Sequence, residues 1–351
     1  MNECSYRPQR NWGARVRIYS YEGLRLVVLE NQVFRIGVLA GKGSDIVELC
    51  YKPRDIDFAW LTPGGVRDPV SHAATAPDDR AVFRDTYPGG WQEIFPNGGA
   101  PSDHDGAHHG QHGEVFNLPW EVSIIQDSEE AVAVRFSVRT RKSPCLLEKT
   151  IRLRSGVPGF RIEERLRNES PVPVRAMWGH HITFGPPFLE AGCRVRLPDD
   201  ITVVPHHEAI APGGRRIGSE DPFPWPREPG TSLDLSVIPD RGAPSDMAYL
   251  TGFGAADAWY EVVRPRDGVG ARIAWDGSQM PIAWFWQEFG GSTGYPWFGR
   301  NYVVGLEPFS SAPNLGLAEA VANGSALTLA PGEERSFWLE MSVIDEPGRP
   351  G

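Results

Sequence analysis

Cysteine is scarce in this chain, and the few cysteines lie far apart. Only four occur among 351 residues, at Cys4, Cys50, Cys145 and Cys193. No two of them form a C-x-x-C pair, so the sequence does not indicate a zinc ribbon or a dithiol redox motif. Long apolar runs are missing too, since none approaches the ~18 residues of a membrane-spanning helix. The net charge is −10 and no basic stretch occurs, which argues against a nucleic-acid-binding surface.

Familiar catalytic signatures are also absent. The sequence contains neither the G-x-S-x-G of a nucleophile elbow nor a P-loop, and its histidines do not fit the H-E-x-x-H pattern. The opening residues, MNECSYRPQRNWGARVRIYS, lack the apolar core of a secretory signal peptide. We therefore expect a cytoplasmic protein that binds neither membranes nor nucleic acid.

Period-two alternation of apolar and polar residues dominates the chain. Val132, Val134, Phe136 and Val138 would share one side of an extended strand, as in an antiparallel sheet with one wet face. Turn residues are dense, with 39 Gly and 32 Pro, which favours short strands and long loops over helices. The sequence thus predicts an all-β fold: one domain over residues 1–351, built as a large antiparallel two-layer β-sandwich with few short helices. The best helix candidate is 313–324, because Gly324 would end it.

Two long segments, 61–80 and 96–114, are expected to be loops. Loops of this length are often functional. The second is rich in histidine and has aromatic and amide-bearing neighbours: Trp91, Phe95, Trp120, Asn97, Gln111 and His112. Aromatic faces beside a few polar groups are what a sugar needs, because its C–H faces are apolar and its hydroxyls must be hydrogen-bonded. The alternative is that the aromatic residues form core and that His112 is structural.

The histidine-rich loop also admits a metal site. His108, His109, His112 and Glu114 offer imidazole and carboxylate ligands. Their spacing fits no recognised zinc pattern, and loop histidines are often simply solvated.

Two further stretches carry groups suited to acid–base chemistry. In WGHHITFG (178–185), His180 and His181 are adjacent, so in a strand they point to opposite faces and cannot share one role. In NYVVGLEPFSSAP (301–313), Glu307 follows an apolar run and precedes Pro308. Poor solvation there would raise its pKa and suit a general base; the alternative is an edge glutamate facing water.

Taken in order, three short motifs resemble the aldose 1-epimerase (galactose mutarotase-like) superfamily. They are His112-Gly113, His181-Ile182-Thr183-Phe184 and Leu306-Glu307-Pro308. Segments 38–60 and 327–343 resemble the early strands and the closing strand pair of that family, so the resemblance covers nearly the whole chain. It implies a large antiparallel β-sandwich with a sugar site on a concave sheet face. The chain departs from the family at Thr183, where Tyr is usual, and in FPNGGAPSDHDG (95–106), which lacks the loop arginine of the galactose enzymes.

The resemblance implies a mutarotase, an isomerase that interconverts the anomers of a free sugar by opening and reclosing the hemiacetal ring. Glu307 would remove the proton of the anomeric hydroxyl, His181 would protonate the ring oxygen, and His112 would hold the ring-oxygen region. We expect these three side chains to converge within about 15 Å, the width of a sugar-sized cleft, and His180 to lie outside the group. The implied sugar contacts are Trp91, Gln92, Asn97, Gln111, Asp246 and Trp286.

The implied reaction involves no redox step, so we expect no cofactor and no catalytic metal. The expected partner is a small-molecule sugar, and the chain is expected to be a monomer or a homodimer. Two other functions stay open. One is a carbohydrate-binding protein without catalysis, since one fold can serve many functions; the other is a metal-dependent sugar isomerase or lyase that uses the histidine-rich loop. If Glu307 is not the base, Glu93 and Glu288 are the next carboxylates to consider.

Overall fold

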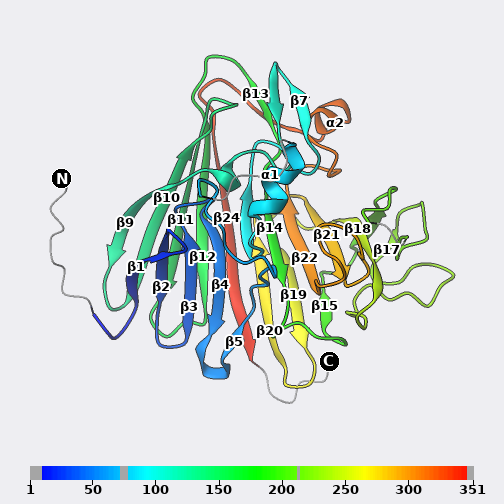
Figure 1. Cartoon of the computed structure of the whole chain (residues 1–351), viewed down its shortest axis with the longest axis horizontal. Coiled ribbons are helices and arrows are strands. Elements are labelled where there is room, and N and C mark those ends of the chain that lie inside the picture. Colours follow the sequence, from blue (N-terminus) through cyan, green and yellow to red (C-terminus); the bar gives the residue numbers. More distant parts are fainter. Residues whose placement is uncertain (1–9, 72–77, 212–213, 346–351) are drawn as a thin grey trace.

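Two large antiparallel sheets face each other across a buried apolar core (Figure 1). The computed structural model describes residues 10–71, 78–211 and 214–345. The predicted all-β sandwich with few short helices is confirmed. The expectation of one domain over 1–351 includes terminal residues, Cys4 among them, that lie outside the described ranges, and it stays a prediction.

The larger sheet carries the strands that matter most for the site. Its strands are β1 (Arg15–Tyr21), β2 (Leu24–Glu30), β3 (Phe34–Leu39), β4 (Asp45–Tyr51), β5 (Ile56–Asp57), β6 (Trp91–Ile94), β14 (Gly179–Phe184), β16 (Thr202–Pro205), β17 (Phe223–Pro224), β18 (Ala243–Thr251), β21 (Ile282–Phe289) and β22 (Val303–Phe309). Their spatial order is β1-β2-β3-β4-β6-β14-β22-β21-β18-β16-β17, with β5 paired to β4. Segments from three distant parts of the sequence therefore meet at β6, β14 and β22.

The smaller sheet covers one face of the larger one. Its strands are β9 (Glu121–Asp127), β10 (Ala131–Arg139), β11 (Cys145–Arg154), β12 (Gly159–Asn168), β15 (Arg194–Arg196), β19 (Ala258–Arg264), β20 (Val269–Trp275) and β24 (Glu334–Asp345). They follow the order β15-β19-β20-β24-β12-β11-β10-β9. Two hairpin-sized sheets complete the described strands: β7 (Ser102–His104) with β8 (Ala107–His109), and β13 (Val174–Ala176) with β23 (Leu327–Leu329).

Helices are few and short among the described residues. They are α1 (Asp79–Thr86), α2 (Leu317–Ala322) and the 3₁₀ turns η1 (Lys52–Arg54) and η2 (Val115–Asn117). Helix α2 lies within the predicted helix 313–324. Helix α1 was not predicted: it starts at the end of the expected loop 61–80, where the side chain of Asp78 caps it by accepting two backbone N–H groups. The second expected loop, 96–114, contains the β7–β8 hairpin. No described helix has the length and apolar character needed to cross a bilayer.

Alternating burial explains many of the strands, and β6, β14 and β22 are exceptions because they are buried throughout. In β10 the predicted inward residues Val132, Val134, Phe136 and Val138 are buried. In β14 all six residues are buried, polar ones included. Both faces of this strand are covered, because the smaller sheet lies against one face and α1 packs over the other.

Candidate active site

His181 and Glu307 face each other across neighbouring strands, β14 and β22. The register pairs Thr183 with Gly305, so two residues along each strand bring 181 opposite 307. Nε2 of His181 lies 3.5 Å from Oε1 of Glu307. A Cβ at Gly305 would lie 2.5 Å from the same oxygen, so glycine leaves the space that the carboxyl group occupies. We call His181 and Glu307 the cavity pair.

Burial sets the protonation of the cavity pair. Desolvation lowers the pKa of His181 to about 4 and raises the pKa of Glu307 well above its ordinary value. Between these two values the pair holds one proton. Oη of Tyr87 lies 3.3 Å from Nδ1 of His181. Because a phenol hydroxyl can donate or accept, Tyr87 can hydrogen-bond Nδ1 of His181 whether or not that nitrogen carries a proton.

His112 lies beside the cavity pair as a neutral donor. Its ring meets that of His181 edge to face, with centroids 5.5 Å apart. The backbone N–H of Gly99 donates to Nδ1 of His112 over 3.2 Å. Burial and the neighbouring His181 lower the pKa of His112. The ring is therefore neutral with its proton on Nε2, and it offers an N–H to the site.

The backbone around His112 explains the H-G motif. His112 has a φ of 59°, and Gly113 has a φ of 75°. A Cβ at Gly113 would lie 2.4 Å from the carbonyl oxygen of Phe95, so only glycine fits. His112 holds its left-handed conformation through a 3.0 Å hydrogen bond from its own N–H to the carbonyl of Gly99. Strain of this kind is commonly retained at functional sites.

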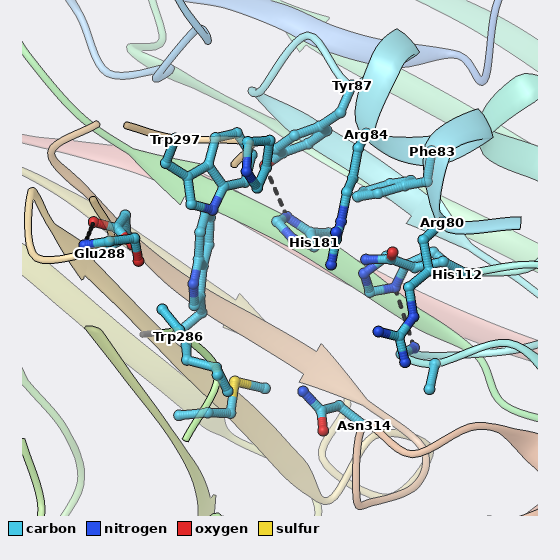
Figure 2. Close-up of a pocket in the computed structure, with 18 of the residues that line it drawn as sticks. Arg80, Phe83, Arg84, Tyr87, His112, His181, Trp286, Glu288, Trp297 and Asn314 are labelled. Atoms are coloured by element: carbon cyan, nitrogen blue, oxygen red, sulfur yellow. Dashed lines mark hydrogen bonds between the residues drawn. The ribbon is translucent and has the colours of Figure 1, made fainter. Parts of the chain in front are cut away.

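His112, His181 and Glu307 line a cavity of about 310 Å³. Figure 2 shows the two histidines at this cavity. Its walls include the aromatic side chains of Phe83 of α1, Tyr87, Trp286 and Trp297. Trp286 lies 5.7 Å from His181 and 6.0 Å from Trp297, measured between ring centroids. The volume is at the small end of ligand sites, which fits one small molecule.

Two of the six predicted contact residues, Gln111 and Trp286, line the cavity. Oε1 of Gln111 is buried without a hydrogen-bond partner among the described residues. Such an atom is costly unless a ligand or water satisfies it. Gln111 therefore supplies an acceptor and Trp286 an apolar face.

Trp91 and Gln92 do not line the cavity. Trp91 packs between the sheets, 5.7 Å from the ring of Phe160, and its Nε1 donates to Nδ1 of His180 over 3.0 Å. Gln92 is fully buried and donates to Asp45 over 3.1 Å. Adjacent strand residues point to opposite faces, so one site cannot use both side chains.

Asn97 and Asp246 hold loops and do not line the cavity. Nδ2 of Asn97 donates to the carbonyl of Gly110 over 3.0 Å, which ties down the segment leading to His112. Oδ2 of Asp246 accepts the backbone N–H groups of residues 216 and 217 over 2.7 and 2.6 Å. Both side chains shape segments beside the cavity.

The other two carboxylates considered as bases have different surroundings. Glu288 lines the cavity, but its oxygens accept from the hydroxyls of Ser245 and Ser292 and from the N–H of Gly290. These bonds make it an anchor for the segment after β21. Glu93 lies between the two sheets, outside the cavity.

The four candidate metal ligands of the histidine-rich loop point to different places. His108 lies at the surface between two aspartates, and His109 is buried. His112 lines the cavity, whereas the carboxylate of Glu114 accepts the backbone N–H groups of residues 141 and 142. They therefore do not form one ligand set.

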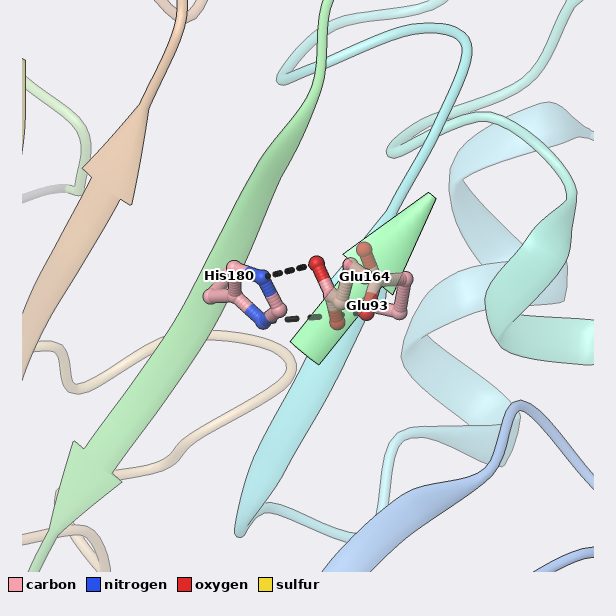
Figure 3. A group of neighbouring side chains, drawn as sticks. All are labelled: Glu93, Glu164 and His180. Carbon is pink, nitrogen blue, oxygen red and sulfur yellow. Dashed lines mark hydrogen bonds and ion pairs between the residues drawn. The ribbon is translucent and has the colours of Figure 1, made fainter. Parts of the chain in front are cut away.

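His180 belongs to a different polar group, which we call the sealed cluster and which consists of Glu93, Lys149, Glu164 and His180. Figure 3 shows His180 with the two glutamates. Nε2 of His180 donates to Glu164 over 3.0 Å, and Nζ of Lys149 lies 3.5 Å from Glu93. Burial raises the pKa of both glutamates to about 7 and lowers that of His180 to about 4. The carboxylate and imidazole atoms lie within 4.8 Å of one another, a spacing that a metal ion can use. Here the ammonium of Lys149 supplies the positive charge.

Sequence reasoning missed two arginines in the cavity wall. Arg80 and Arg84 lie one turn apart on α1, and both side chains extend toward the cavity (Figure 2). The signal was present in DDRAVFRDTY (78–87), where Asp78 is a capping residue and the arginines are spaced i, i+4.

Comparison with solved structures finds the same fold in several bacterial proteins. A proposed aldose 1-epimerase from Klebsiella pneumoniae is 17% identical, with a TM-score of 0.74 over 95% of this chain and 84% of its own. A galactose mutarotase-like protein from Clostridium acetobutylicum is 14% identical, with a TM-score of 0.67 over 95% and 99%. Another from Lactobacillus casei is 14% identical, with a TM-score of 0.57 over 91% and 99%. The predicted galactose mutarotase-like fold is thus confirmed.

Sequence comparison leads to a family without an assigned activity. No curated protein matches the chain. A family model described as a domain of unknown function, DUF4432, matches residues 21–220 and 239–343. The matched residues make up most of the chain. The chain therefore belongs to the DUF4432 family and has the galactose mutarotase-like fold.

Proposed function

We propose that the chain is an aldose 1-epimerase-like isomerase that interconverts the anomers of a free monosaccharide. One observation carries the proposal: Nε2 of His181 lies 3.5 Å from Oε1 of Glu307 in the wall of a small cavity that several aromatic side chains help to line. Burial holds a single proton between these two groups. Such a pair can give one proton and take another in the same step.

The reaction needs this kind of exchange. As the bond between the anomeric carbon and the ring oxygen breaks, Glu307 takes the proton of the anomeric hydroxyl and His181 gives its proton to the ring oxygen. The carbonyl group turns over in the open chain, and the reverse transfers close the ring on the other face. This direction begins with the proton on His181, and a substrate hydroxyl that donates to Glu307 favours that ionised form. The proton count of the pair is the same before and after.

Other groups of the cavity support sugar binding. The Nε2–H of His112 is a donor suited to the ring oxygen, where negative charge develops during opening. Oε1 of Gln111 and Oε1 of Glu307 are buried acceptors without hydrogen-bond partners among the described residues. Trp286 and Trp297 offer apolar faces for the C–H side of a sugar. A purely sugar-binding protein would need the acceptors and the aromatic faces, but not a buried acid–base pair.

Mutarotation of freshly dissolved pure anomers tests the proposal. Polarimetry or NMR exchange should show acceleration over the spontaneous rate for at least one neutral or acidic aldose. Acceleration should survive dialysis against a chelator, since the transfers use side chains alone. Binding without acceleration of any aldose would favour the carbohydrate-binding alternative. Loss on chelation, restored by a divalent ion, would favour the metal-dependent one.

A further inference from the structure

Two arginines of α1, Arg80 and Arg84, lie in the cavity wall. Arg80 and Arg84 lie on the same face of α1, and neither forms an ion pair with any described residue. Burial lowers the pKa of Arg84, and repulsion from Arg80 lowers it further. Arg84 is partly buried and Arg80 is exposed. Two neighbouring cations are unfavourable where one of them is partly desolvated, unless an anion offsets them.

The acidic groups near α1 are engaged elsewhere. Asp78 caps the helix, and Asp79 bonds His108. Asp85 accepts from the hydroxyl of Tyr295. These three carboxylates therefore bond other groups, while the two arginines of the helix reach toward the cavity (Figure 2).

The carboxyl groups inside the cavity do not offset the arginines either. Glu307 keeps its proton through burial, because its pKa is raised. Glu288 is hydrogen-bonded to two serine hydroxyls. Glu208 lies exposed at the cavity rim and forms no ion pair with Arg80 or Arg84. The two guanidinium groups of α1 thus reach the cavity without an ion-pair partner among the described residues.

We infer that the substrate is an aldose bearing an anionic group, a carboxylate, phosphate or sulfonate, which Arg80 and Arg84 bind. This inference rests on the proposed function for the ring chemistry, but the anion subsite is separate from the cavity pair. Guanidinium groups bind such oxyanions through charge-assisted, paired hydrogen bonds. The anomeric end of the sugar would face His181 and Glu307, and its charged end would face α1.

Cyclic sugars that cannot open test the subsite independently of catalysis. The probes are 1,5-anhydrohexitols of gluco and galacto configuration, each as the neutral compound, the 6-phosphate and the corresponding uronic acid. Calorimetry should show at least one anionic probe binding about 10-fold or more tightly than its neutral parent, the strength of hydrogen bonds to a charged group. Comparing phosphate with carboxylate identifies the anion. Raising the ionic strength should weaken anionic binding selectively.

Arginine variants then locate the site. Arg84→Gln and Arg80→Gln should each bring the ratio of anionic to neutral affinity toward 1, by about 10-fold for each charge-assisted hydrogen bond removed. Arg165→Gln, the same charge change on the exposed outer face of β12, should leave the ratio as in the wild type. Equal binding of neutral and anionic probes, or an unchanged ratio in the double arginine variant, would overturn the inference. Neither result would bear on the proposed function, because the mutarotation assay tests that separately.

Discussion

Strand β14 supplies the histidine of two His–Glu groups from adjacent positions, and the two groups differ in what surrounds them. His181 meets Glu307 at the wall of a cavity, whereas His180 meets Glu164 between two sheets. The sealed cluster includes a cation, Lys149, but no cation pairs with the carboxyl group of the cavity pair among the described residues. Glu307 therefore keeps its proton through burial alone and can exchange it with a ligand. Access to a cavity and the lack of a paired cation among the described residues thus distinguish the cavity pair from the sealed cluster.

Removal of the cation from the sealed cluster should give the largest effect. Lys149→Met leaves two buried carboxyl groups without their counter-charge. Breaking a buried ion pair typically costs about 3–5 kcal/mol of stability. The loss of stability should grow as the pH rises. Without Lys149 the buried glutamates stay protonated in the folded protein, whereas they ionise in the unfolded chain, and a higher pH favours the ionised, unfolded form. Urea unfolding followed by tryptophan fluorescence measures it. Lys142→Met at the exposed surface is the matched control and should stay within about 0.5 kcal/mol of the wild type. Equal stability of the two variants would contradict the structural role.

The adjacent histidines give the sharpest contrast. His181→Asn should lower turnover by ~10²-fold or more, the usual effect of losing one general acid. Its unfolding free energy should change little. His180→Asn should do the reverse, costing about 1–3 kcal/mol because it disturbs buried hydrogen bonds, while turnover per folded molecule stays within a few-fold of the wild type. An equal loss of turnover in both variants would contradict the different roles of His181 and His180.

Gly305→Ala should move the carboxyl group of Glu307 without removing it, and so test whether its position matters. The new methyl group would meet the movable end of Glu307, so the carboxyl group shifts and the backbone does not. We expect turnover to fall by about 10-fold, since a displacement of an ångström already costs this much or more. The melting temperature should change little. Wild-type turnover would show that Glu307 need not sit where the structure places it.

The pH dependence of turnover should show the smallest effect: the loss of activity on acidification should occur at a lower pH than an ordinary histidine would give. The lowered pKa of His181 means that it stays neutral until the pH falls to about 4, when a second proton enters the pair and activity is lost. The raised pKa of Glu307 means that the shared proton is lost only on the alkaline side of the ordinary glutamate range. Activity should therefore persist as the pH falls through ~6.5, the ordinary histidine value. An acid limb at that ordinary value would contradict the desolvated pair.

The sequence predicted much of the fold, and it predicted that His112, His181 and Glu307 come together, as they do at the cavity. Alternation predicted sheets, and it required His180 and His181 to point to opposite faces. The resemblance, and not the alternation, chose His181. The same rule applied to β6 would have shown that Trp91 and Gln92 cannot both contact one ligand.

What the sequence did not predict depends on long-range packing. The spacing of Arg80 and Arg84 is visible in the sequence, but their approach to the cavity depends on how α1 crosses the larger sheet. Asn97 and Asp246 are polar residues near the cavity, and only the path of the loops shows that they bond backbone groups and do not line it.

The most direct test of the central claim is the mutarotation rate of Glu307→Gln on an aldose that the wild type accelerates. Glutamine keeps the shape and a hydrogen-bonding group but cannot take a proton. The account predicts a fall in turnover of ~10²-fold or more, with a much smaller change in sugar affinity and an intact unfolding transition. Wild-type turnover in a folded Glu307→Gln protein would contradict it.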